Sequence, residues 1–241
     1  MNSQQTEHCI VCATPLLYSN QVANRVCFLC GKKEISAIVC PEGHFICNAC
    51  HGDSSLVNLP KQIEKARGYS PEDILETLMQ VPGLPMHGPE HHALAGLALL
   101  LACERNGVDL PDNYIDEVMR RSIQIPGGAC GYLGTCGGAV SLGIAVSIVT
   151  KATPLTGLAR GMANRASALA LLRCSDDQPR CCKRALRRTV AAGRDFFKDE
   201  LGIAFPPPNA SQQCKDISRN NECAQDRCPY FRQIHRDRHN A

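Results

Sequence analysis

Residues 93–103 read Ala-Leu-Ala-Gly-Leu-Ala-Leu-Leu-Leu-Ala-Cys, a stretch in which no side chain carries a charge. Because a helix that is apolar on every face is buried by its neighbours, this stretch predicts the central helix of a helical bundle. The chain of 241 residues is 44% hydrophobic but contains no Trp, five Tyr and six Phe. Leu, Ala, Val and Ile must therefore fill the core, which favours helices over a β-sandwich.

Five further helices are expected around this central one. The first begins at Ser70, a preferred N-cap residue that is followed by a proline suited to the first helical turn. The second follows Pro111, and the third covers 139–150, where small residues permit close packing between helices. The last two are expected over 158–172 and 182–201.

The predicted fold is mainly α, with a small zinc-stabilised module before the helical bundle and an irregular tail after it. The expected boundaries are 1–52 for the module, 60–205 for the helical domain and 206–241 for the tail. The longest apolar run, 137–149, is about 13 residues long and therefore too short to span a membrane. Residues 1–10 are polar and do not show the basic and apolar segments of a signal peptide, so the sixteen cysteines are expected to be thiolates on metals in a reducing cytoplasm.

Seven cysteines and one histidine crowd the first fifty residues and form four pairs. The pairs are Cys9 with Cys12, Cys27 with Cys30, Cys40 with His44, and Cys47 with Cys50. Four such pairs supply the eight ligands of two tetrahedral zinc ions, and a shell of Cys and His alone leaves no open position for catalysis. We therefore expect two structural zinc ions that fold the module, with iron in the same sites as the alternative.

Two arrangements of these pairs stay open. In a cross-brace, one ion binds Cys9, Cys12, Cys40 and His44, and the other binds the remaining four cysteines; alternatively, consecutive pairs share an ion. The string at 40–50, Cys-Pro-Glu-Gly-His-Phe-Ile-Cys-Asn-Ala-Cys, resembles the middle of RING-type and treble-clef zinc fingers. That resemblance implies a ribbon-like or treble-clef-like module. No Cys-x2-Cys pair follows Cys50, so ubiquitin-ligase activity is not expected.

A second group of cysteines is expected in the helical domain. Cys130 and Cys136 lie in the glycine-rich stretch 127–138, where backbone amides can approach a ligand closely and the following helix presents its positive end. Cys181 and Cys182 stand at the start of another predicted helix. Together these four cysteines predict an iron–sulfur or redox-active thiol site. The alternative is that the glycines serve helix packing and the cysteines are small buried residues.

The tail contains a further metal-binding set, made of Cys214, Cys223 and Cys228. Three thiolates need a fourth ligand to complete a zinc or iron–sulfur site. The candidates for that position are His235, His239 and Cys174. A tail with unpaired thiols is the alternative.

His91 is a candidate catalytic residue, together with Cys130 and Cys136. It stands four residues after His87, a spacing that suits a metal on one helix face, and next to Glu90. Helix capping and surface placement form the alternative. A hydrolase or transferase built on these residues lacks a complete nucleophile and base pair, so that function is not favoured.

Basic residues gather between 173 and 198, although the net charge of the chain is only +3. Arg184, Arg187 and Arg188 share a helix face there and could hold a phosphate-bearing ligand; a solvated helix face is the alternative. A protein partner or a small anionic ligand is expected. Nucleic-acid binding has weaker support, because no aromatic residues alternate with the basic ones, and no membrane partner is expected.

The string Gly-Thr-Cys-Gly-Gly-Ala-Val-Ser-Leu-Gly-Ile-Ala at 134–145, with Cys-Cys-Lys-Arg at 181–184, resembles an uncharacterised family of anaerobic archaea and bacteria. That resemblance covers nearly the whole chain, including its cysteine-rich start, whereas 130–182 is more distantly similar to small redox-active proteins. The expected function is that of a cytoplasmic metal-binding protein with two structural zinc ions and a thiolate metal or iron–sulfur redox site in the helical domain. The alternative is a non-enzymatic, zinc-dependent adaptor for a protein or nucleic-acid partner.

Overall fold

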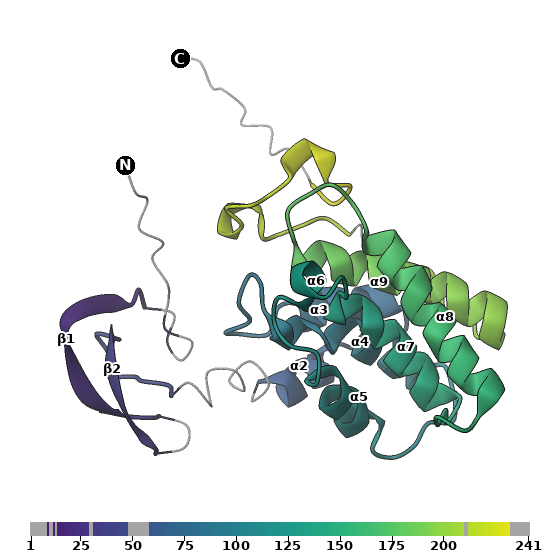
Figure 1. The fold of residues 1–241 in the computed structure, drawn as a ribbon, viewed down its shortest axis with the longest axis horizontal. Helices are drawn as coiled ribbons and strands as arrows, with labels where there is room; N and C mark the ends of the chain where they lie inside the picture. The colour runs from purple at the N-terminus through teal and green to yellow at the C-terminus, as the bar shows by residue number, and fades with distance from the viewer. Residues whose placement is uncertain are drawn as a thin grey trace. The chain divides into compact units, whose positions relative to one another are not determined.

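The computed structural model describes residues 9, 12, 14–28, 31–47, 58–209 and 212–231 (Figure 1). The chain divides into two compact units, one formed by Met1–Ile63 with Gln80–Leu84 and the other by Glu64–Met79 with Pro85–Ala241. We call them the N-terminal unit and the helical unit. The tail from residue 212 belongs to the same compact unit as the helices.

The described part of the N-terminal unit contains an antiparallel hairpin of β1 (Leu17–Val26) and β2 (Lys33–Val39), with a register shift that interrupts the ladder. The sequence does not predict this hairpin. Its apolar residues Val22 and Ile35 are largely exposed, so the strands lack the regular alternation of buried and exposed side chains that marks a strand.

Eight α-helices are present in the described part of the chain. They are α2 (Leu59–Lys65), α3 (Pro71–Leu78), α4 (Leu94–Arg105), α5 (Tyr114–Ser122), α6 (Ala129–Tyr132), α7 (Gly137–Val149), α8 (Gly157–Cys174) and α9 (Cys182–Leu201). The prediction of a mainly helical fold is therefore confirmed. Among the described residues, no helix is long and apolar enough to cross a membrane.

The α4 helix lies at the centre of the helical unit, as its composition predicts. Every residue from Leu94 to Cys103 is buried, and α4 packs against α3, α5, α7 and α9. The α7 helix is the second buried element and contacts α4, α5, α8 and α9. In contrast, α8 buries only Ala166 and Ala170, so it covers one side of α7 and leaves most of its own surface exposed.

Small residues set the distance between α7 and α8. A Cβ atom at Gly143 would overlap the Ser167 hydroxyl and lie 2.6 Å from the backbone oxygen of Ala163. Gly143→Ala is therefore expected to destabilise the helical unit by about 1–3 kcal/mol through overpacking, measured by urea unfolding. The matched control is Gly161→Ala in α8, where the nearest atom, Arg165 Nη1, is 3.6 Å away. This variant should gain about 0.5–1 kcal/mol from helix propensity; equal stability of the two variants would contradict the packing argument.

Candidate metal centres

Four ligands of the N-terminal unit come together as a group. The ligand atoms of Cys9, Cys12, Cys40 and His44 all lie within 4.8 Å of one another. The Cys12 and Cys40 sulfurs are 3.6 Å apart, and the Cys40 sulfur is 3.7 Å from His44 Nδ1. A tetrahedral ion with metal–sulfur bonds of about 2.3 Å requires ligand atoms about 3.8 Å apart, so the group could hold one metal ion. It joins the first and third pairs of the sequence, which is the cross-brace grouping.

Local backbone structure positions this group. The Cys40 residue directly follows β2, and Gly43, with a φ of +80°, forms the turn that brings His44 back toward Cys40. Hydrogen bonding to Thr14 lowers the pKa of the exposed Cys12 thiol to about 6. A thiol that ionises this easily is already close to the form that binds metal.

Only two ligands of the second expected zinc site lie among the residues that the structure describes. Cys27 follows β1 and Cys47 lies beyond His44, and both are buried. Cys30 and Cys50 lie outside the described residues. The segments that contain Cys27 and Cys47 contact each other through a hydrogen bond of 2.7 Å from the Phe28 backbone amide to the Phe45 backbone oxygen. The rings of Phe28 and His44 also contact each other edge to face.

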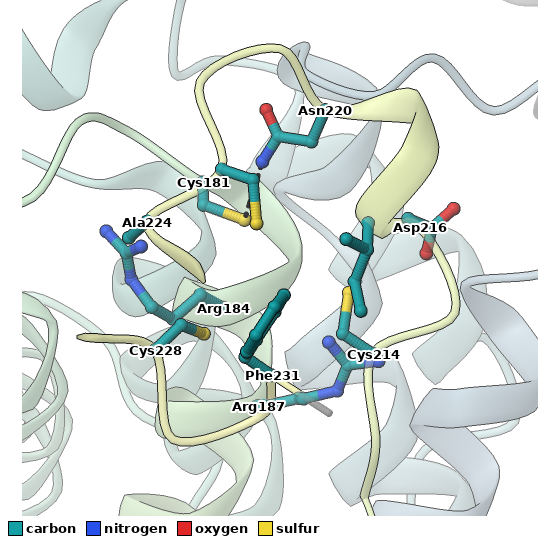
Figure 2. A pocket seen from close by; sticks show the side chains of 11 residues that line it. Cys181, Arg184, Arg187, Cys214, Asp216, Asn220, Ala224, Cys228 and Phe231 are labelled. Atoms are coloured by element: carbon teal, nitrogen blue, oxygen red, sulfur yellow. Dashed lines mark hydrogen bonds between the residues drawn. The ribbon is translucent and has the colours of Figure 1, made fainter. Parts of the chain in front are cut away.

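The three tail cysteines gather around one small cavity, and Cys181 completes the set (Figure 2). Cys181 is the N-cap of α9, whereas Cys214, Cys223 and Cys228 come from the tail. We call these four residues the tail cysteine set. Of the fourth ligands suggested by the sequence, Cys174 lines a different cavity, and His235 and His239 lie outside the described residues.

The tail cysteine set is spread more widely than a single zinc ion requires. Among the described residues, the N-terminal group is the one set of three or more ligand atoms that all lie within 4.8 Å of one another. The cavity between the tail sulfurs has a volume of about 20 Å³, which leaves no room for an organic ligand. The four sulfurs could hold a metal, whereas an organic ligand would not fit between them.

Buried contacts hold the tail against the helices. The Lys183 side chain is 1% exposed, and its Nζ lies 3.2 Å from both Asp216 Oδ2 and the backbone oxygen of Met79. Burial lowers the pKa of Lys183, while Asp216 opposes that shift. Further along the tail, the Cys214 amide donates to the Tyr230 oxygen at 2.8 Å. The tail cysteine set is thus built on a fixed part of the helical unit.

The three arginines of α9 are not a solvated face, which corrects one reading of the sequence. Arg187 is 2% exposed and binds Glu76, while Arg184 is 6% exposed and binds Asp176, as does Arg188. The guanidinium groups already form ion pairs with these carboxylates. A phosphate or nucleic acid would have to displace them.

The arginines also lie beside the sulfurs of the tail set. Arg184 and Arg187 line the cavity, and Figure 2 shows both next to its cysteines. Burial raises the pKa of Cys181, and nearby Cys214 and Cys228 raise it further, whereas Arg184 lowers it. Four thiolates around one small cavity repel one another, so a cation is needed to keep them all ionised.

A second, larger cavity of about 530 Å³ lies in the helical unit. It is lined by Cys130, Cys136, Cys174, Cys181 and Cys182, together with Asp176 and Arg180, Arg184 and Arg188. The four cysteines that the sequence groups together all reach this cavity. Cys181 lines both cavities, and Cys174, which the sequence assigns to the tail as one option, is at the larger one.

The histidines near η1 (Pro89–His91) do not join these cysteines. His91 is 1% exposed, and burial lowers its pKa to about 3, so its ring is neutral. Its Nδ1 lies 3.2 Å from the Gly88 oxygen, and His87 Nε2 lies 3.3 Å from Asn220 Oδ1. Surface placement is therefore wrong for His91, and none of the three histidines lines either cavity described above.

The fold and these groups define a mainly helical protein with an N-terminal Cys3His group that could hold a metal ion. The chain belongs to the DUF5714 family, a family of unknown function whose model matches residues 60–231. The match includes the helices and the tail cysteine set but not the cysteine-rich start, which corrects the expectation of a likeness over nearly the whole chain. No curated protein and no solved structure matches the chain.

Proposed function

We propose that this protein is a cytoplasmic iron–sulfur protein whose centre is bound by Cys181, Cys214, Cys223 and Cys228. The observation that carries the proposal is the convergence of these four cysteines on one small cavity within the region matched by the family. Four cysteines are the common ligand set of both [2Fe–2S] and [4Fe–4S] clusters. The wide separation of the sulfurs favours a cluster over a single zinc ion.

A bound cluster would supply one-electron redox chemistry. The surrounding residues are suited to tune its potential. The Asn220 side-chain amide donates to the Cys181 sulfur at 3.8 Å, and the Gln225 backbone amide donates to the Cys223 sulfur at 3.4 Å. Hydrogen bonds to sulfur and the positive charges of Arg184 and Arg187 stabilise the reduced, more negative state of a cluster. A redox centre of this kind exchanges electrons with a protein partner.

The N-terminal unit is proposed to be folded by two zinc ions in the cross-brace grouping. The first ion would bind Cys9, Cys12, Cys40 and His44, and the second would bind Cys27, Cys30, Cys47 and Cys50. A full set of Cys and His ligands favours a structural role over catalysis. The unit therefore serves as a docking module, while the redox chemistry belongs to the helical unit.

The test is metal and sulfide analysis of the full chain purified without oxygen. We expect zinc together with iron and acid-labile sulfide, and an electron paramagnetic resonance signal in the oxidised or the reduced state. Cys214→Ser should lose the iron and sulfide but keep the zinc. The control is Cys103→Ala in α4, whose thiol is fully buried and has its pKa raised to about 12 by burial; this variant should keep all three components. Zinc alone in the unmodified chain would overturn the cluster.

A further inference from the structure

Two cysteines of the larger cavity form a pair that the proposed cluster does not use. Cys136 is the N-cap of α7, and Cys174 is the last residue of α8, a helix that packs along α7. Both side chains line the larger cavity, and each thiol shifts the pKa of the other. The Cys174 sulfur also lies 3.5 Å from the Ala185 oxygen and 3.7 Å from Thr189 Oγ1, so α9 holds it in position.

We propose that Cys136 and Cys174 are a redox-active dithiol, which exchanges with the disulfide bond of small anionic molecules that enter the larger cavity. This activity goes beyond the proposed cluster and does not depend on it. The cluster ligands and the dithiol are different residues, so the two proposals can fail separately.

The two thiols differ in the way that thiol exchange requires. The Cys174 thiol, followed by the backbone amides of Ala139 and Gly138, lowers the pKa of Cys136 to about 6 despite burial. The same interaction raises the pKa of Cys174. Cys136 also stands at the N-terminus of the 13-residue helix α7, whose backbone amides favour a thiolate, so it suits the attack on a disulfide, while Cys174 suits the second, resolving step.

The surroundings of the pair favour a dithiol over another metal site. Among the described residues, no third ligand atom lies within 4.8 Å of both sulfurs. Cys130 lines the same cavity but is exposed, and Cys182 has its pKa raised to about 11, chiefly by burial. A structural metal bound to Cys136 and Cys174 would require Cys130 and Cys182 to bind the same ion as thiolates.

The cavity has the size and charge to admit an anionic organic molecule. Its volume of about 530 Å³ lies within the usual range for small-molecule sites. Three arginines line it against a single acid, Asp176, which binds Arg184 and Arg188. Arg180 is 54% exposed, and its nearest carboxylate, that of Glu222, is 4.0 Å away. Arg180 is thus the arginine best able to meet a substrate carboxylate or phosphate.

The exchange proceeds in two balanced steps. The Cys136 thiolate attacks one sulfur of the disulfide R–S–S–R, forms a Cys136–S–S–R bond and releases one RS⁻. The Cys174 thiol then loses its proton to solvent and attacks the Cys136 sulfur, which forms the Cys136–Cys174 disulfide and releases the second RS⁻. The protein pair loses two electrons, and the small disulfide gains them to become two thiols.

The first experiment treats the metal-loaded full chain with one equivalent of dithiobis(nitrobenzoate), an aromatic disulfide with two carboxylates. The fast phase should release two coloured thiolates per reagent and leave a Cys136–Cys174 disulfide, detected as tryptic peptide 122–151 joined to 174–180. Cys174→Ser should release one thiolate and retain the other half of the reagent on Cys136. Cys136→Ser should lose the fast phase, whereas Cys130→Ser, on the same peptide, should behave as the unmodified chain.

Several results would overturn the dithiol. Cys174→Ser could still release two thiolates in the fast phase, or the new disulfide could join other cysteines. Loss of iron or zinc from Cys136→Ser or Cys174→Ser would make the pair metal ligands instead. Iron and sulfide are measured on the same samples, so absence of the cluster with intact exchange chemistry would overturn the proposed function and leave the dithiol standing.

The second experiment tests the class of substrate. The rate constants with dithiobis(nitrobenzoate) and with neutral dithiodipyridine are compared at low salt. Arg180→Gln should lower the preference for the anionic reagent by about two- to fivefold, the range expected for one exposed charge. Arg160→Gln, on the exposed face of α8, should not change it. An unchanged preference in Arg180→Gln would remove the anionic specificity from the proposal.

Discussion

Replacing Cys181 by serine is expected to abolish iron and sulfide binding, whereas replacing the adjacent Cys182 is expected to leave both in place. Cys181 is the N-cap of α9 and lines the small cavity with the tail cysteines. Cys182 is the first residue of the helix and lines only the larger of the two cavities. At this turn from extended to helical backbone, both side chains reach the larger cavity but only that of Cys181 also reaches the small one.

The measurement is iron and sulfide per chain in Cys181→Ser and Cys182→Ser, purified together without oxygen. Each variant is the other's control, because both remove one sulfur at nearly the same place in the chain. Zinc content should be equal in both, since the N-terminal ligands are untouched. Loss of iron from Cys182→Ser, with retention in Cys181→Ser, would reverse the assignment of the two cysteines.

Replacing Arg187 by methionine is expected to destabilise the helical unit by about 3 kcal/mol, because one partner of a buried ion pair is removed. Arg187 is 2% exposed, and its Nη2 donates to Glu76 Oε2 at 2.8 Å. Its guanidinium carbon also lies 5.3 Å from the centre of the Tyr230 ring in the tail. Methionine keeps much of the volume but leaves Glu76, which is 21% exposed, without this counter-charge. Urea unfolding followed by circular dichroism measures the loss.

Two further variants separate charge from packing at this position. Arg187→Met combined with Glu76→Gln should recover part of the lost stability, since an amide costs less to leave without a cationic partner than a carboxylate. Arg120→Met is the surface control: its side chain is 61% exposed and pairs with Glu117, so the cost should stay below about 1 kcal/mol. A cost for Arg187→Met as small as that of Arg120→Met would show that the buried pair adds little.

Most of the helices follow from signals within the sequence. The prediction of 182–201 coincides with α9, which ends where Gly202 adopts a φ of +68°. The central position of α4 follows from a stretch with no polar face. The short helices α2 and α6 are not predicted, because each is too short to show a helical period and α6 lies among glycines that argue against a helix.

The candidate site is predictable in its residue types but not in its groupings. The sequence identifies the cysteines and indicates metal and thiol chemistry, yet it joins Cys181 to Cys130 and Cys136 and offers His235, His239 or Cys174 as the fourth ligand of the tail. The structure brings Cys181 to both cavities and Cys174 to Cys136. Likewise, the arginines of α9 look like a charged surface in the sequence but are paired with acids, Asp176 in the segment before α9 and Glu76 in the distant helix α3.

Local sequence therefore accounts for the helical class, most helix boundaries and the soft-ligand chemistry, because caps, breakers and side-chain types act over a few residues. Which sulfurs meet is a matter of tertiary structure. Cys181 and Cys214 are brought together by the return of the tail, which the ion pair of buried Lys183 with Asp216 holds against the helices. This contact depends on packing between distant segments, so the spacing of the cysteines predicts the tail triad but not Cys181 as its partner.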